Sequence, residues 1–174
     1  MKILSKNTGY SRAYGKNPYS GYDDISSSPF LLDTKVNDKL PPMRRVATVE
    51  INEKTKAYSY KVLENKKVIN DVFENKNLVL FYKKEVLSVL DNSQIKNSQK
   101  VGSSSIYESK LDGVLLEFYY DNGFFDKQTK SQWNIFGSSI KGKLKGKQLK
   151  EIVFGSHFWF AWAVFKPNTI IYKE

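Results

Sequence analysis

The only histidine of the sequence lies in its densest run of aromatic residues. After His157 come Phe158, Trp159, Phe160, Trp162 and Phe165. An imidazole exchanges protons near neutral pH without special surroundings, so His157 is a candidate general acid or base. The competing interpretation is structural: the ring packs on its aromatic neighbours while a ring nitrogen bonds a carbonyl or carboxylate oxygen.

Two carboxylates, Asp23 and Asp71, could assist such an imidazole. Asp71 follows an apolar pair and Asn70, and such a side chain often bonds backbone amides at a turn instead. Asp23 shares a segment with Arg12, and those two could simply form an ion pair. Our second hypothesis is therefore an enzyme, a hydrolase or lyase with His157 as acid or base and Asp23 or Asp71 assisting.

The N-terminal segment offers residue types suited to binding rather than catalysis. Residues 5–42 are rich in Gly, Pro, Ser, Asn and Tyr and carry little apolar periodicity, which predicts a long irregular arm. Tyrosine rings can stack on sugars or bases, while charged and amide groups orient a polar ligand. We expect a ligand pocket between this arm and the His157 segment, lined by Arg12, Tyr14, Asn17, Tyr19, Tyr22, Asp23, His157 and Trp159.

The chain is basic, with 28 Lys and Arg against 18 Asp and Glu and a net charge of +10. If residues 141–147 form a strand, four lysines share one face: Lys141, Lys143, Lys145 and Lys147. This basic surface could meet an anionic partner, or it could be the solvated edge of a sheet. Nucleic-acid binding is our third hypothesis and the weakest, because nearly all the cations are Lys rather than Arg.

Several chemistries are excluded by composition. The sequence has no cysteine and one histidine, which removes disulfides, thiolate metal sites, cysteine nucleophiles and a multi-histidine metal site. A hard-cation site made from carboxylates and carbonyls stays open, but no EF-hand-like spacing of acidic residues supports one. We therefore expect neither a metal nor a cofactor. There is no Gly-x-Ser-x-Gly motif, and the glycines and lysines of residues 142–147 do not follow the phosphate-loop order. No apolar run approaches the roughly 20 residues of a membrane-spanning helix.

The pattern of short strands and turns predicts a single, mainly β domain over residues 1–174, α+β at the margin. We expect an irregular arm over 1–44, a β-rich body over 45–155, a buried helix over 156–166 and a final strand over 167–174. Residues 77–82 form an apolar run typical of a central strand, and Asp112-Gly113 predicts a hairpin turn. An antiparallel barrel or a sandwich fits this spacing.

The prediction of a helix over residues 156–166 is based on the residues at its two ends and on its composition. Ser156 could cap the first turn, and Pro167 forbids continuation. The segment is apolar nearly all round, so we expect burial on every face.

Five blocks make the chain resemble the family labelled domain of unknown function 3179. They are residues 8–12 with 14–23, 40–43, 57–58 with 68–71, 125–133, and 157–169. Many members carry a Cys-Pro-Leu-Cys segment where this chain has residues 83–88, and Lys130 stands where a glycine is usual. The resemblance implies no established activity.

Members of that family often look exported, so the resemblance implies an extracytoplasmic or envelope-associated protein. A cytoplasmic protein is the alternative, because residues 1–6 lack the apolar segment of a signal peptide. Our first hypothesis is therefore a non-catalytic binding module at the cell envelope. Its expected partner is an anionic envelope polymer or a small polar ligand.

Overall fold

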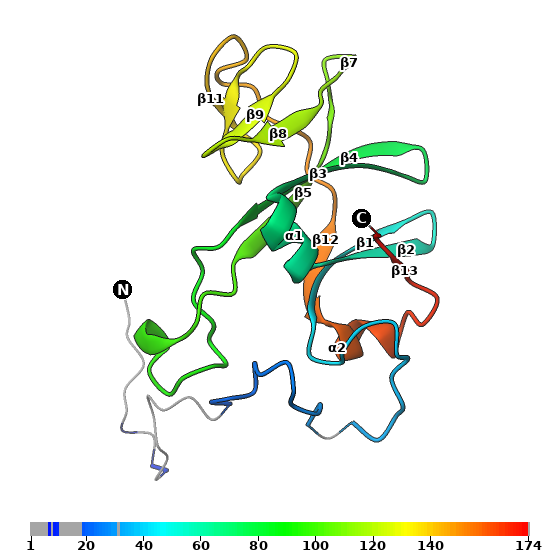
Figure 1. Ribbon diagram of the computed structural model, residues 1–174, viewed down its shortest axis with the longest axis vertical. Coiled ribbons are helices and arrows are strands. Elements are labelled where there is room, and N and C mark those ends of the chain that lie inside the picture. Colours follow the sequence, from blue (N-terminus) through cyan, green and yellow to red (C-terminus); the bar gives the residue numbers. More distant parts are fainter. Residues whose placement is uncertain (1–6, 8, 11–18, 31, 174) are drawn as a thin grey trace.

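The computed structural model describes residues 7, 9–10, 19–30 and 32–173 (Figure 1). Most regular elements are short strands. Their bounds are β1 (Arg45–Ile51), β2 (Lys54–Ser59), β3 (Val68–Phe73), β4 (Lys76–Lys83), β5 (Ser103–Glu108), β6 (Lys110–Leu111), β7 (Val114–Leu115), β8 (Phe118–Tyr120), β9 (Phe124–Asp126), β10 (Gln132–Trp133), β11 (Ser139–Lys141), β12 (Phe154–Phe158) and β13 (Ile170–Ile171). The helices are α1 (Tyr60–Lys66), the 3-10 turn η1 (Ile95–Asn97) and α2 (Trp159–Ala163).

Three sheets and a hairpin are built from these strands. The first sheet has the order β12-β1-β2-β13, the second β3-β4-β5, and the third β11-β10-β9-β8, while β6 and β7 pair alone. All pairs are antiparallel except β13 with β2, which is parallel. The third sheet lies at one end of the molecule and α2 at the other, with the first and second sheets between (Figure 1).

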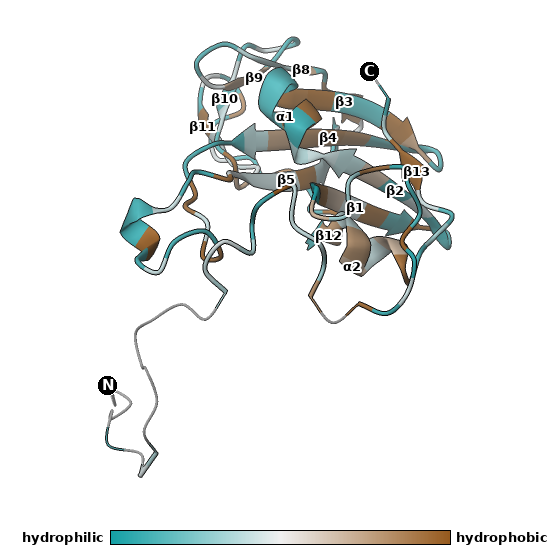
Figure 2. Ribbon diagram, turned by 60° about the horizontal axis from the view of Figure 1, so that its bottom comes forward, coloured by the Kyte–Doolittle hydropathy of each residue, from teal (hydrophilic) through white to brown (hydrophobic). Residues whose placement is uncertain are grey.

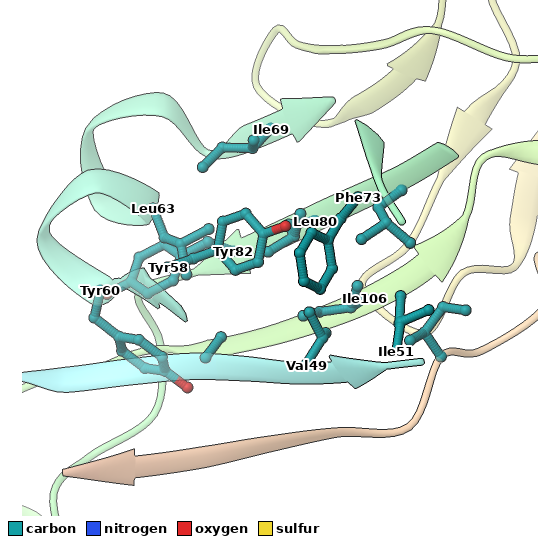
Figure 3. Packing of buried hydrophobic residues seen from close by; sticks show 13 residues of the cluster. Val49, Ile51, Tyr58, Tyr60, Leu63, Ile69, Phe73, Leu80, Tyr82 and Ile106 are labelled. Carbon is teal, nitrogen blue, oxygen red and sulfur yellow. The ribbon is translucent and has the colours of Figure 1, made fainter. Parts of the chain in front are cut away.

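The main core fills the space between the first and second sheets. Alternate residues of β1 and β2 meet residues of β3, β4 and β5, and α1 closes one end (Figure 3). Its labelled members are Val49, Ile51, Tyr58, Tyr60, Leu63, Ile69, Phe73, Leu80, Tyr82 and Ile106. The hydrophobic residues accordingly concentrate in the strands of these two sheets (Figure 2).

Two further clusters cover the outer faces of these sheets. On the second sheet, Val79 and Phe81 pack against Phe118 and Trp133 of the third sheet. The predicted central strand is confirmed, because β4 is hydrogen-bonded on both sides and its residues 78–82 are buried. On the first sheet, β1 and β2 pack against α2 and the arm, through Val46, Ala57, Trp159, Ala163, Val36 and Leu40.

The prediction of a mainly β fold with antiparallel sheets is confirmed. We expected a barrel or a sandwich, and the first and second sheets pack face to face as in a sandwich. The described strands do not form a closed barrel. The hairpin at Asp112-Gly113 is also present, with positive φ of 49° and 84° at the two residues, as a tight two-residue turn requires. None of the described helices is long and apolar enough to cross a membrane.

The helix expected over residues 156–166 begins later and is less buried than predicted. Ser156 and His157 belong to β12, where they pair with Ala47 and Val46 of β1. The helix starts at Trp159, and no side chain caps it. Only one side is buried, since Trp159 is fully covered whereas Phe165, just beyond the helix, is 81% exposed.

The prediction that four lysines share one face of a strand over residues 141–147 is also wrong. Lys141 ends β11, and the chain then turns through Gly142 and Gly146, whose φ angles are 91° and 86°. Lys143 and Lys145 lie in this turn, so their side chains do not alternate along a strand. Lys147 pairs with Asp112 at 2.8 Å.

The short helix α1 follows β2 directly. Ser59 caps α1, because its hydroxyl accepts a hydrogen bond from the Val62 amide. The turn redirects the chain from the first sheet to the second, and it places Tyr60 and Leu63 in the core.

Candidate functional site

The arm is attached to the sandwich by an ion pair between Asp23 and Arg45. The guanidinium Nε and Nη2 donate to the two carboxylate oxygens of Asp23, each at 3.0 Å. The Ser88 hydroxyl also donates to this carboxylate. The Asp23 side chain is only 4% exposed, so the arm buries a fully paired carboxylate at the start of β1.

Aromatic contacts reinforce this attachment. The Arg45 guanidinium lies over the Phe158 ring at 4.7 Å. Tyr22 meets the same ring edge-on, with centroids 6.0 Å apart. The arm therefore contacts the end of β12. The partner of Asp23 is Arg45. Arg12, the partner suggested by the sequence, lies outside the described residues.

A small cavity of about 210 Å3 opens beside this ion pair. The arm, the start of β1, α1 and the segment before β5 enclose it. We call it the basic pocket; its lining is Asp23, Ile25, Met43, Arg44, Arg45, Tyr60, Lys61, Glu64, Tyr82, Gln99, Lys100 and Val101.

The charges around the basic pocket do not balance. Its two carboxylates already have partners, since Asp23 binds Arg45 and Glu64 binds Lys84. Among the described residues, no carboxylate pairs with the remaining three cations, Arg44, Lys61 and Lys100. The pocket therefore presents net positive charge to anything that enters it.

Two tyrosines contribute to the wall of the basic pocket. The Tyr60 hydroxyl lies 2.9 Å from the Ser156 hydroxyl and 3.2 Å from that of Ser104. The Tyr82 hydroxyl donates to the Val101 carbonyl at 3.1 Å, and burial raises the pKa of Tyr82 to about 12. The Tyr82 ring therefore stays neutral at physiological pH and adds a hydrogen-bonding group without negative charge.

Gly102 lets the chain pass close to Tyr82. A Cβ at this position would lie 2.3 Å from the tyrosine oxygen, and the φ angle of 76° is one that a side chain disfavours. The segment before β5 can thus fold against the ring and complete the pocket wall.

His157 occupies a different environment. Its ring centroid lies 5.1 Å from that of Trp162, and the two ring planes are tilted by 32°. It also covers Gly155, where a Cβ would come within 2.0 Å of the imidazole Nε2. Burial lowers the pKa of His157. Its ring makes no hydrogen bond to any of the described residues.

The strand register separates His157 from Asp23. His157 pairs with Val46, which faces α2, whereas the neighbouring pair of Phe158 and Arg45 faces the opposite side of the sheet. Because side chains alternate along a strand, the imidazole and the Asp23 carboxylate lie on opposite faces. The structure does not bring these two catalytic candidates together.

Asp71, the third catalytic candidate, belongs to a buried cluster between β2 and β3. It accepts a hydrogen bond from the Tyr58 hydroxyl at 2.8 Å and pairs with Lys56 at 2.5 Å. The Lys56 ammonium also lies within 5.7 Å of the Tyr58, Phe73 and Tyr172 ring centroids. Burial, together with the negative charge of Asp71 and the hydrogen bond to it, raises the pKa of Tyr58.

The remaining predicted ligand-binding residues are divided among several places. Tyr19 and Tyr22 line an open cavity of about 540 Å3 within the arm. Trp159 is fully buried in the cluster on α2, so its ring contributes to the core. Arg12, Tyr14 and Asn17 lie outside the described residues. No described group of His, Asp and Glu is arranged to hold a metal ion.

The family model described as protein of unknown function, DUF3179, matches residues 1–169. The chain belongs to this family. No curated protein and no solved structure matches the chain.

In this member of the DUF3179 family, residues 83–88 run beside the basic pocket. They follow Tyr82, which lines the pocket, and end at Ser88, which bonds Asp23. The pocket cations Arg44, Lys61 and Lys100 were missed, because they come from three separate segments and share no local motif.

Proposed function

We propose that this protein is a non-catalytic binding module for a small anionic ligand, which it holds in the basic pocket. The observation that carries the proposal is the set of three pocket cations without a described carboxylate partner, Arg44, Lys61 and Lys100. An anionic ligand would supply the missing negative charge. Its oxygens would accept hydrogen bonds from these cations.

The geometry supports recognition more than catalysis. The Asp23 carboxylate is fully engaged by Arg45 and Ser88, and His157 faces the other side of the sheet. A group that already accepts several hydrogen bonds is poorly placed to accept a proton from a substrate. The pocket residues therefore serve best as fixed charges and hydrogen-bonding partners.

Isothermal calorimetry with glucuronate and with inorganic phosphate tests the proposal. We expect both to bind the wild-type protein, and binding to weaken as salt is added. The double variant Lys61→Gln, Lys100→Gln should bind about tenfold more weakly, because two charge-assisted contacts are lost. Both lysines are exposed, so the substitutions leave the core intact.

A matched control separates the pocket from general basicity. The double variant Lys141→Gln, Lys143→Gln removes the same charge from the exposed segment at the end of β11. It should bind as the wild type does. No binding by the wild type, or an equal loss in both double variants, contradicts the proposal.

We also propose an extracytoplasmic location, for which the support is the resemblance to exported family members and the net charge of +10. A basic surface suits an envelope rich in anionic polymers. Fractionation of the native cells beside a cytoplasmic marker protein tests this location. Recovery of the protein with the marker contradicts it.

A further inference from the structure

Two further cavities adjoin the basic pocket through shared lining residues. A second cavity, of about 390 Å3, shares Asp23, Ile25 and Gln99 with the basic pocket. Through Gly21 it also shares a wall with the 540 Å3 cavity of the arm. We call these three adjoining cavities the arm groove.

The arm groove is fixed to the body of the protein. The Gly21 amide and the Ser20 hydroxyl both donate to the Asp91 carbonyl, at 2.8 and 3.2 Å. The Tyr22 hydroxyl accepts from the Phe30 amide at 3.3 Å, which joins the two sides of the outer cavity. With Asp23 bound to Arg45, residues 19–30 form a defined wall.

The chemistry of the wall changes along the arm groove. At the inner end, three cations of the basic pocket, Arg44, Lys61 and Lys100, have no carboxylate partner among the described residues. The middle cavity is acidic and is lined by Asp23, Asp24 and Asp91. The outer cavity is lined by aromatic rings and small residues, and its Phe30 side chain is 69% exposed.

We propose that the ligand is a short oligosaccharide with a single anionic group. This inference rests on the proposed function, since the anionic group binds in the basic pocket. The pocket's 210 Å3 is below the roughly 300–1,000 Å3 of a complete ligand site, so it suits only the charged end. Sugar hydroxyls would donate to the carboxylates of Asp24 and Asp91 in the middle cavity, and a sugar ring would stack on the outer aromatic side chains.

The acidic middle of the arm groove argues against a nucleic acid. A polynucleotide carries a negative charge on every unit. Such a chain, with one phosphate in the basic pocket, would place the next ones beside Asp23, Asp24 and Asp91. The negative charge of the middle cavity therefore favours a ligand whose units beyond the anionic group are neutral and carry hydroxyl groups.

Calorimetry with four probes tests this inference: glucuronate, a neutral glucose trisaccharide, the same trisaccharide ending in one glucuronate, and a thymidine pentanucleotide. We expect the acidic trisaccharide to bind about tenfold more tightly than glucuronate, the gain typical of one ring stacked on an aromatic side chain. The neutral trisaccharide and the pentanucleotide should both bind more weakly than the acidic trisaccharide.

Phe30→Ala should remove the tenfold gain for the acidic trisaccharide and leave glucuronate binding unchanged. Phe136→Ala is the matched control, because Phe136 is 74% exposed and lies in the turn after β10. Equal binding of glucuronate and the acidic trisaccharide, no effect of Phe30→Ala, or tighter binding of the pentanucleotide overturns the oligosaccharide proposal. Failure of glucuronate itself to bind overturns the proposed function instead.

Discussion

Asp23 and Arg45 form a bidentate ion pair, with both nitrogen–oxygen distances at 3.0 Å. It joins residues 22 apart in the sequence and fastens the arm to the first residue of β1. The Asp23 side chain is 4% exposed and the Arg45 side chain 23% exposed. Because water reaches these charges poorly, each is balanced mainly by the opposite charge of its partner.

Removing only one partner of this pair should therefore be costly. Arg45→Met leaves the Asp23 carboxylate buried without a cation, and we expect a loss of about 3 kcal/mol in the free energy of unfolding. The double variant Asp23→Asn, Arg45→Met should recover part of that loss, since no unpaired charge remains. Urea melts measure both values, and equal losses in the single and double variants would show that the charges act independently.

The two tryptophans of α2 differ in what the same substitution removes. Trp159 is fully buried, and its indole nitrogen has no hydrogen-bond partner among the described residues. Trp162 is partly exposed, and its nitrogen donates to the Thr169 hydroxyl at 2.8 Å. Replacement by Phe removes an uncompensated polar group at the first position and a formed hydrogen bond at the second.

We expect Trp159→Phe to cost less than about 2 kcal/mol, because the lost ring volume is partly offset by the removal of the unpaired group. Trp159→Ala should cost about 3–5 kcal/mol, the range for deleting a buried large ring. Trp162→Phe should cost about 1 kcal/mol through its hydrogen bond. Denaturant midpoints measure all three, and an unchanged midpoint for Trp159→Ala would contradict the packing of α2 on the first sheet.

Lys130, where the family resemblance leads us to expect a glycine, has a left-handed backbone with φ of 57°. Its ammonium lies 5.1 Å from the Tyr119 ring centroid, a contact that both Lys130→Gly and Lys130→Ala remove. The two variants then differ mainly in backbone preference, and glycine should be more stable by about 1 kcal/mol. Thermal melts of the pair measure this difference, and greater stability of the alanine variant would contradict the assigned turn.

Elements governed by local pattern were predictable from the sequence. The apolar run that became β4, the Asp112-Gly113 turn and the return strand β13 all carry their signals within a few adjacent residues. The pairing of Ser156 with Ala47 spans more than a hundred residues. That long-range pairing outweighed the helical composition of the segment, so β12 replaced the first turn of the expected helix.

The site was less predictable than the fold, for the same reason. Tyr22 and Asp23 were expected in it from the arm motif, and they do contact the body beside the basic pocket. Arg44, Lys61 and Lys100 meet only because β1, α1 and the segment before β5 converge there. In a chain with so many lysines, no local pattern distinguishes these cations from solvated ones.

His157 predicts a dependence of stability on pH that does not require a catalytic role. Burial lowers its pKa below the ordinary value of 6.5, while Gly155 and the Trp162 ring cover the imidazole. In the unfolded chain the ring takes up its proton near pH 6.5, whereas the native protein takes it up only at lower pH. The unfolded state therefore binds more protons between these two values, and the free energy of unfolding must fall as the pH is lowered through that window.

Urea melts between pH 7.5 and 5.5 should show this fall in the wild type and not in His157→Gln, whose amide does not titrate in the range. The stability that His157 contributes as a neutral ring is fully present above pH 6.5, and the loss should level off below the native pKa. Lys143→Gln, which changes one exposed charge far from the ring, should retain the wild-type slope. An equal slope in His157→Gln and the wild type would show that the ring is as accessible to protons in the folded protein as in the unfolded chain.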